Sequence, residues 1–169
     1  MTGTARAGTW CRVAALAAAL GLTGCAVPEW QKPGTPATQL ARDLGQPQVR
    51  VLLPDGGERW VYSRQPAGQQ VFHMVLDAHQ RLLRVEQVLQ PAHFQRLRPG
   101  QDVRQDVFNY FGKPALVEHV ASFQGDIWTY RISENNMDRQ AHVFIDPQGV
   151  VQRIMFTDEL RNEPDDRSH

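Results

Sequence analysis

The sequence predicts an α+β fold made of two tandem modules, each a helix followed by an antiparallel sheet. The chain has 169 residues, which is enough for one ordinary domain or two small ones. The same motifs occur twice in the same order, at an offset that drifts only from 67 to 69 residues. The gaps between the apolar runs are short, and short gaps favour antiparallel meanders over parallel crossovers.

The composition is that of a folded protein with no electrostatic preference for nucleic acid. Lys and Arg number 18 and so do Asp and Glu, which makes the formal net charge zero. A neutral chain has no general attraction for phosphate backbones. Hydrophobic residues make up 41% and charged residues 21% of the chain, both close to globular averages.

Residues 1–24 are predicted to be a secretory signal peptide. Arg6 and Arg12 supply positive charge, and residues 13–22 form an apolar run that is too short to span a bilayer. Leu22-Thr23-Gly24-Cys25 follows and resembles the bacterial lipobox, whose cysteine is lipidated and becomes the mature N-terminus. The alternative is an ordinary signal peptide with a cysteine near its cleavage site.

The lipobox resemblance implies a permanent membrane anchor. It implies three acyl chains on Cys25, palmitate among them, and two or more chains anchor a protein stably. Ala26 directly after the cysteine implies sorting to the outer membrane, with the protein facing the periplasm. Cys11 leaves with the signal peptide, so we expect neither a disulfide nor a free thiol in the mature domain.

The rest of the chain divides into a tether, two repeats and a tail. Residues 25–36 hold the lipidated cysteine and a Pro-rich tether, 37–90 the first repeat, 91–157 the second and 158–169 a polar tail. The motifs that define the repeat are Asp43–Pro47 with Tyr110–Pro114, Arg59–Tyr62 with Ile127–Tyr130, and His73–Asp77 with His142–Asp146.

Each repeat is predicted to begin with a helix that ends at a glycine. Gly45 and Gly112 occupy the position after the helix, and a proline follows two residues later in both repeats. Thr35 and Pro36 are expected to cap the first helix and to start it. The apolar residues that share one helix face are Leu40, Ala41 and Leu44 in the first repeat, and Val107, Phe108 and Phe111 in the second.

Four strands are predicted after each helix. Pro54–Gly57 and Asp146–Gly149 have the composition of tight turns between neighbouring strands. The expected strand ranges are 48–53, 59–64, 70–77 and 82–89 in the first repeat, and 115–123, 126–132, 140–146 and 150–157 in the second.

Two Trp-x-Tyr pairs are the most distinctive side chains on these strands. Trp60 and Tyr62 share one face of their strand, as do Trp128 and Tyr130 in the second repeat. They are either core residues under the helix or an exposed aromatic surface for a partner, since Trp and Tyr are favoured at interfaces. We expect at least one member of each pair to be buried, because one sheet face must cover its helix.

No catalytic or metal-binding motif accompanies the repeat. His73 and Asp77 are four residues apart in a strand, and so are His142 and Asp146; that spacing is roughly 13 Å, too long for a hydrogen bond. Both histidines are expected to be partly exposed. The sequence also lacks the zinc-protease, Cys-x-x-Cys and phosphate-loop motifs, so we expect no enzymatic activity, no metal and no cofactor.

The segment from Arg98 to Pro114 resembles the helix signature of the SmpA/OmlA family of small outer-membrane lipoproteins. In that signature a glycine and a polar stretch lead to a helix that ends in an apolar-Gly-x-Pro sequence. Trp128, Tyr130 and residues 141–146 resemble the family's next strands. The family includes an accessory subunit of the β-barrel assembly machine, which has one such module where this chain has two. The tandem arrangement also resembles β-lactamase inhibitor proteins, which join two modules through a concave aromatic sheet face.

These resemblances imply a non-catalytic, lipid-anchored protein-interaction module at the periplasmic face of the outer membrane. It would support envelope or outer-membrane-protein assembly. The expected partners are membrane lipid, through Cys25, and an envelope protein, through a surface that includes Trp60, Tyr62, Trp128 and Tyr130. The alternative is a periplasmic inhibitor-like or ligand-sequestering protein that uses a concave sheet face.

Replacing Cys25 tests the lipid anchor. Cys25→Ala removes the thiol that carries the acyl chain, so the variant should incorporate no fatty-acid analogue and should remain uncleaved or soluble. Metabolic labelling and membrane fractionation measure both effects, and Cys11→Ala is the matched control that should keep its label. Equal labelling of Cys25→Ala and the wild type would exclude a lipid anchor at this residue.

Overall fold

A computed structural model describes residues 27–159 of the chain. The expected signal peptide, Cys25 and residues 160–169 of the expected polar tail lie outside the described residues. The helical elements are η1 (Pro28–Trp30), α1 (Ala37–Leu44), α2 (Pro91–Phe94) and α3 (Arg104–Phe111). The strands are β1 (Val49–Leu52), β2 (Glu58–Ser63), β3 (Val71–Leu76), β4 (Leu82–Gln87), β5 (Leu116–Val120), β6 (Phe123–Glu134), β7 (Met137–Ile145) and β8 (Val151–Asp158).

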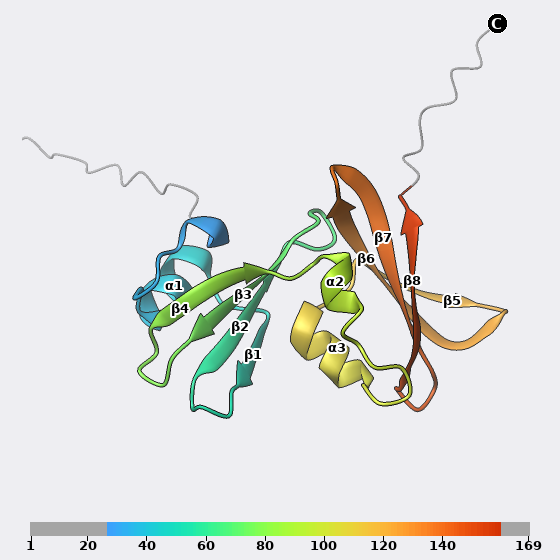
Figure 1. The fold of residues 1–169 in the computed structure, drawn as a ribbon, viewed down its shortest axis with the longest axis horizontal. Coiled ribbons are helices and arrows are strands. Elements are labelled where there is room, and N and C mark those ends of the chain that lie inside the picture. The colour runs from blue at the N-terminus through green and yellow to red at the C-terminus, as the bar shows by residue number, and fades with distance from the viewer. Residues whose placement is uncertain (1–26, 160–169) are drawn as a thin grey trace, which may run out of the picture.

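The strands form two four-stranded antiparallel sheets, each a simple meander (Figure 1). Sheet 1 has the order β1-β2-β3-β4 and sheet 2 the order β5-β6-β7-β8. The predicted α+β class with two sheet modules is therefore confirmed. The largest difference from the expected strand ranges is in β6, which starts three residues earlier and ends two residues later than 126–132.

The two sheets make the same contacts at positions that the sequence repeat relates. The Tyr62 hydroxyl donates to the Gly45 carbonyl at 3.0 Å, and the Tyr130 hydroxyl donates to the Gly112 carbonyl at 2.9 Å. Each bond ties the residue after a helix to the second strand of the sheet that follows it. The other recurring contacts are the bridges Pro36–Arg81 and Val103–Val150, and the turn bonds from Arg81 N to Asp77 and from Val150 N to Asp146.

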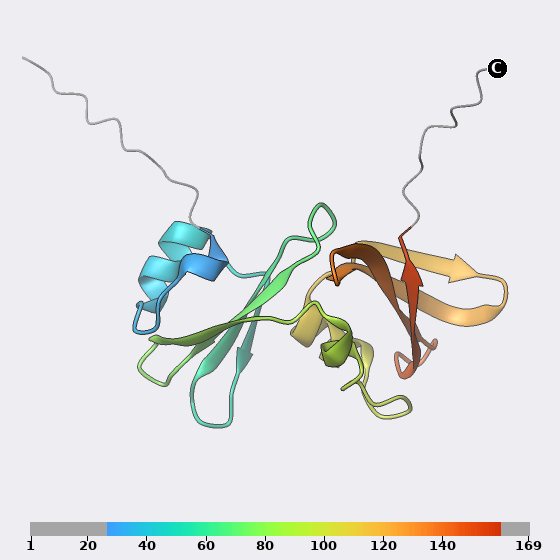
Figure 2. The ribbon, with the colours of Figure 1, turned by 45° about the horizontal axis from the view of Figure 1, so that its top comes forward.

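The elements stack in the order α1, sheet 1, α3 with α2, and sheet 2 (Figures 1 and 2). Sheet 1 is covered on both faces, whereas sheet 2 is covered on one. The core between α1 and sheet 1 contains Ala37, Leu40, Trp60, Met74, Leu76 and Leu82. The larger core around α3 contains Val49, Val61, Val71, Val88, Leu89, Phe94, Val107, Phe111, Tyr130, Ile132, Ala141, Val143, Ile145 and Val151.

The start of α1 differs from the expectation. Pro36 is the N-cap residue and makes no side-chain cap, while the Thr35 hydroxyl donates to the Lys32 carbonyl at 2.7 Å. The end of the expected tether is also attached to sheet 1, because Gly34 N donates to Leu82 O and Leu82 N donates to Thr35 O. The edge strand β4 has backbone groups that no further strand pairs, and residues 34–36 satisfy some of them.

Two glycines allow the chain to pass a strand bulge at close range. The pairing register shifts between Val75 and Leu76 in sheet 1, and at the equivalent place in sheet 2. A Cβ atom on Gly57 would lie 2.3 Å from the Leu76 carbonyl oxygen, and one on Gly125 would lie 2.1 Å from the Ile145 carbonyl oxygen. No side chain fits at either position unless the bulge moves.

Alanine substitutions at adjacent glycines should therefore differ in cost. Gly57→Ala places its methyl group against a backbone carbonyl, whereas Gly56→Ala meets nothing closer than the Ala78 Cβ at 3.6 Å. Gly56 has φ +80°, so its substitution costs about 1–2 kcal/mol in backbone strain. Gly57→Ala should cost at least about 1 kcal/mol more, because the bulge must be displaced. Chemical denaturation of the full-length variants measures the difference, and equal costs would contradict the close approach.

Candidate functional site

The structure places one residue of each Trp-x-Tyr pair in the core. Trp60 is 3% exposed beneath α1, and its indole N–H donates to Glu58. Tyr130 of β6 is fully buried against α3. An exposed contact surface that includes these two residues is therefore wrong. The physical reason is the two-residue period of a strand, which turns both members of a pair toward the face that a helix covers.

The other two members of the pairs are half-buried and also pack against the core. Tyr62 lies against the α1 core and Trp128 against the α3 core. The Arg104 guanidinium lies 6.0 Å from the Trp128 ring centroid. All four side chains are buried or half-buried, so the pairs pack each helix onto its sheet and do not form an open aromatic surface.

His73 was expected to be partly exposed, and this expectation is wrong. The side chain is 2% exposed, its Nε2 lies 2.6 Å from the Tyr110 carbonyl oxygen, and the Tyr110 ring meets the imidazole edge-on at 4.7 Å. Burial lowers the pKa of His73 to about 4, opposed by its hydrogen bond to Tyr110. His73 is buried because α3, from the second repeat, covers the face of sheet 1 that was expected to be open.

His142, the equivalent residue in sheet 2, lies instead in a polar row on the face that no helix covers, although Thr129 in this row is only 2% exposed. Its Nδ1 is 2.9 Å from the Thr129 hydroxyl, and its Nε2 is 2.8 Å from the Thr157 hydroxyl. Thr129 also donates to Glu118 at 3.3 Å. Burial lowers the pKa of His142, and Glu118 opposes that shift. The row thus links all four strands of sheet 2 through a half-buried imidazole.

Strand β5 presents the largest continuous exposed segment of sheet 2. All five of its residues are exposed, and three of them are apolar: Leu116 at 51%, Val117 at 44% and Val120 at 41%. β5 is the first strand of the sheet, so one of its edges has no neighbouring strand. We call these five residues the β5 edge and treat it as the candidate binding surface.

One sequence feature of the β5 edge is that its apolar residues lie at neighbouring positions and do not alternate with polar ones. Leu116 pairs with Thr129 and Val117 pairs with Trp128, so the apolar residues of β5 face both sides of the sheet. A strand with apolar residues on both faces normally lies in the middle of a sheet. In β5 both faces are exposed, and only the strand order reveals this.

Two further features bear on the site within residues 27–159. No three His, Cys, Asp or Glu side chains in this part of the chain gather closely enough to hold a metal ion. No helix described there is long and apolar enough to cross a membrane.

The chain matches no protein-family model and no curated protein. Among solved structures it is similar to the crystal structure of a DUF4309 family protein (YjgB) from Bacillus subtilis. That similarity covers 74% of this chain and 79% of the other chain, with a TM-score of 0.32 and 11% sequence identity. A likeness at this level carries no argument about function.

Tryptophan substitutions should separate core from surface. Trp60→Ala should lose about 3–5 kcal/mol of stability, the usual cost of emptying a buried aromatic site. Trp30→Ala is the matched control, because Trp30 is 75% exposed and its loss should change stability by no more than about 0.5 kcal/mol. Denaturant unfolding of the full-length variants measures both. Equal, small losses would mean that Trp60 is not packed beneath α1.

His73 should make the protein less stable in acid. The folded pKa of about 4 lies below the ordinary value, so the unfolded chain binds the extra proton between pH 6.5 and 4. The contribution of the neutral imidazole is complete above pH 6.5 and is lost as the pH falls toward 4, where the loss reaches roughly 3 kcal/mol.

The comparison of His73→Gln with the wild type isolates this contribution. The difference in unfolding free energy between the two proteins should change with pH inside that window and stay constant above it. His79→Gln changes an exposed histidine and is the control whose difference from the wild type should be small throughout. A pH-independent difference for His73→Gln would contradict the burial of a neutral imidazole.

Proposed function

We propose that this protein is a non-catalytic, lipid-anchored protein-interaction module at the periplasmic face of the outer membrane. Its partner is an extended segment of an envelope protein, which adds to sheet 2 along the β5 edge. The lipobox-like Leu22-Thr23-Gly24-Cys25 supports the anchor, and the exposed β5 edge carries the interaction. The SmpA/OmlA resemblance supports the same proposal, whereas the resemblance to tandem inhibitor modules is the basis of the inhibitor-like alternative.

An exposed apolar edge strand is suited to binding another strand. Its outer edge offers unpaired backbone N–H and C=O groups, and a partner strand satisfies them in an antiparallel or parallel ladder. Leu116 on one face and Val117 on the other would both be covered by the partner's side chains. Backbone hydrogen bonds supply affinity in this mode, and side chains on alternate faces supply selectivity.

Charge favours a different protein over a second copy of this chain. If two β5 strands paired antiparallel about their centres, Glu118 would lie opposite Glu118, and like charges at directly paired positions destabilise a sheet. A partner strand with Lys or Arg opposite Glu118 forms a favourable cross-strand pair instead. The partner is therefore expected to be an apolar strand with a basic residue near its middle.

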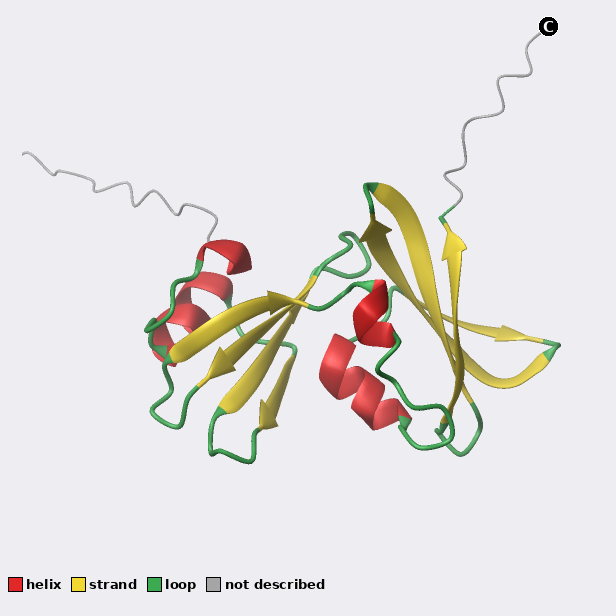
Figure 3. Cartoon of the chain, in the orientation of Figure 1, coloured by secondary structure: helices red, strands yellow, loops and turns green. Residues whose placement is uncertain are grey.

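The position of the β5 edge also suits a membrane-anchored protein. The first described residues lead into η1 and α1 at one end of the molecule, and β5 lies at the opposite end (Figure 3). An anchor that precedes η1 would thus hold α1 and sheet 1 closer to the membrane. The β5 edge would then be presented to the periplasm.

Site-specific photo-cross-linking in living cells tests this function. A photoreactive amino acid at Val117 should cross-link to an outer-membrane or periplasmic assembly protein. The matched control carries the same amino acid at Gln39, an exposed residue of α1, and should give no such product. Adding Leu116→Lys to the Val117 probe should reduce the yield, because charges on an edge strand oppose strand addition.

Three other outcomes have defined meanings. Equal products at Val117 and Gln39, or none at Val117, would contradict binding along the β5 edge. A product with a soluble hydrolase would favour the inhibitor-like alternative over envelope assembly.

A further inference from the structure

A cleft of about 330 Å³ lies between sheet 1 and the segment that contains α2 and α3. Side chains from β1, β2, α2, α3 and the connection after α2 line it, so neither repeat forms it alone. Its volume lies at the lower end of the range for small-molecule sites. The lining residues that matter for binding are Val51, Arg59, His93, Arg96, Leu97 and Tyr110.

Three guanidinium groups and two carboxylates line the cleft, so its formal charge is +1. Arg59, Arg96 and Arg98 line it together with Asp102 and Asp106. Asp102 is occupied by Arg98, whose Nε and Nη2 donate to it at 3.0 and 2.6 Å. Asp106 accepts the backbone N–H of Val103 at the start of α3. Among the described residues, Arg59 and Arg96 form no salt bridge.

Arg59 is held in place but is poorly satisfied. Its Nη2 donates to the Asn109 carbonyl at 3.3 Å, and its guanidinium carbon lies 5.1 Å from the Tyr110 ring centroid. Its Nε is buried and has no hydrogen-bond partner among the described residues. Burial lowers the pKa of Arg59, and Tyr110 and Glu86 oppose the shift. Leaving a guanidinium in this state costs free energy that an anionic ligand would offset.

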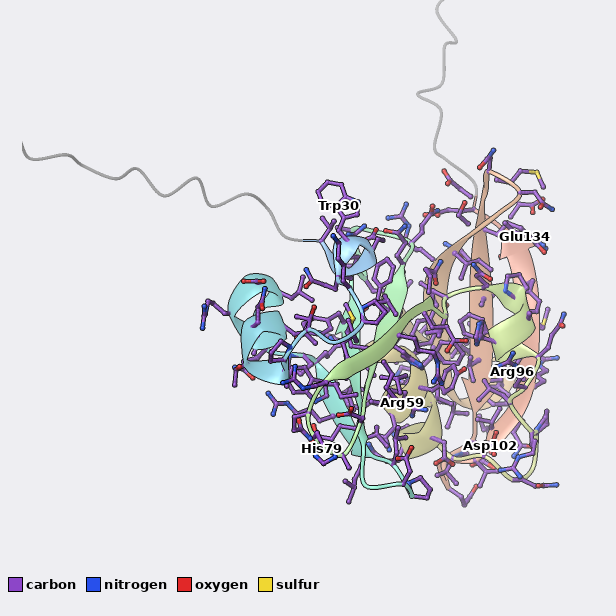
Figure 4. The ribbon with its side chains drawn as sticks, turned by 60° about the vertical axis from the view of Figure 1, so that its left-hand side comes forward. Trp30, Arg59, His79, Arg96, Asp102 and Glu134 are labelled. Atoms are coloured by element: carbon purple, nitrogen blue, oxygen red, sulfur yellow. The ribbon has the colours of Figure 1, made fainter. Side chains whose placement is uncertain are left out.

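The other polar groups of the cleft are neutral hydrogen-bonding groups. His93 Nδ1 lies 2.8 Å from the Tyr110 hydroxyl, and its Nε2 lies 3.8 Å from Glu86. Burial lowers the pKa of His93 and raises the pKa of Tyr110. The Arg96 guanidinium also faces the Tyr110 side chain. Figure 4 shows Arg59 in the middle of the molecule, with Arg96 and Asp102 on the side of the second repeat.

These polar residues are positions at which the two repeats differ. Arg59 corresponds to Ile127, and Tyr110 corresponds to Asp43, whereas the Trp-x-Tyr and Gly-x-Pro motifs are shared. The shared residues pack the helices onto the sheets, as the contacts of Trp60 and Tyr130 show. The differing residues line the cleft, so their chemistry is not required by the fold of a single module.

We infer that this cleft binds a carboxylate that is carried by an apolar body, such as the C-terminal residue of a peptide. Arg59 and Arg96 would hold the carboxylate, since a guanidinium matches its two oxygens. Val51 and Leu97 would contact the apolar part. A monoanion fits better than a phosphate dianion, because the three arginines and two aspartates that line the cleft leave a formal surplus of one positive charge. This inference is independent of the proposed function.

Titration of the full-length protein with matched small probes tests it. N-acetylleucine carries a carboxylate on an apolar body, and N-acetylleucinamide has the same body without the charge. Backbone amide NMR shifts of Asn109 and Tyr110 should saturate with N-acetylleucine. The amide and inorganic phosphate should each bind at least about ten-fold more weakly, because a charge-assisted hydrogen bond is lost or a second negative charge is added.

Charge-matched variants locate the site. Arg96→Gln changes an exposed residue and should weaken N-acetylleucine binding at least about ten-fold without unfolding the protein. Arg59→Gln should weaken N-acetylleucine binding to a similar extent. The backbone amide NMR shifts of the core residues check that this variant remains folded. Arg42→Gln removes one positive charge from the exposed side of α1 and should change the affinity less than about two-fold.

Several results would overturn the inference. Equal binding of N-acetylleucine and its amide would show that the carboxylate is not recognised. Tighter binding of phosphate would assign the cleft to a different anion. Unchanged affinity in Arg96→Gln, or an equal loss in Arg42→Gln, would show that the cleft guanidinium groups are not the site.

Discussion

Helix α3 is eight residues long, yet it must supply apolar surface to two sheets at once. Val107 and Phe111 are fully buried in a core that contains residues of both sheets, and Phe111 stacks on Phe94 of α2 with ring centroids 4.1 Å apart. Tyr110, beside them, contacts His73 of sheet 1 through both its carbonyl and its ring. The contact between the two repeats rests on this packing and on the turn after β2, where the Gln65 side chain donates to the Arg131 carbonyl and accepts from the Arg131 N–H of β6.

The double packing also decides which surfaces remain for binding. Helices pack on both faces of sheet 1, so it has no open face for a partner. Sheet 2 has one face on which no helix packs, where His142 joins Thr129 and Thr157 in a polar row. It also has the exposed β5 edge. The cleft beside Arg59 arises at the same contact, because α2 and α3 cannot fill all the space against β1 and β2. The cleft thus follows from the way in which one repeat docks on the other, whereas the β5 edge follows from the strand order of sheet 2.

Much of each module could be predicted from residue patterns. The glycines after α1 and α3 have φ of +80° and +72° with ψ of −171° and −158°, a region that glycine enters far more readily than other residues, and the tight turns lie where Pro, Asp and Gly cluster. The expectation that at least one member of each Trp-x-Tyr pair is buried is confirmed, since Trp60 and Tyr130 are buried, but the half-burial of Tyr62 and Trp128 was not predicted. Strand periodicity assigns a side chain to a face, but it does not say how deeply a neighbour covers that face.

The sequence alone predicted the helices α1 and α3, the eight strands and the two-sheet α+β organisation, but not η1 or α2. Hydrophobic period, turn chemistry and motif spacing are local properties of the chain, which is why these elements could be predicted. The tertiary structure alone decided that His73 is buried, that β5 is an exposed edge and that Arg59, His93 and Arg96 share one cleft. The burial of His73 and the cleft depend on which face of sheet 1 receives α3, whereas the β5 edge depends on the strand order of sheet 2. That choice is made by long-range packing, and the pattern within either repeat would permit the face to stay open to water.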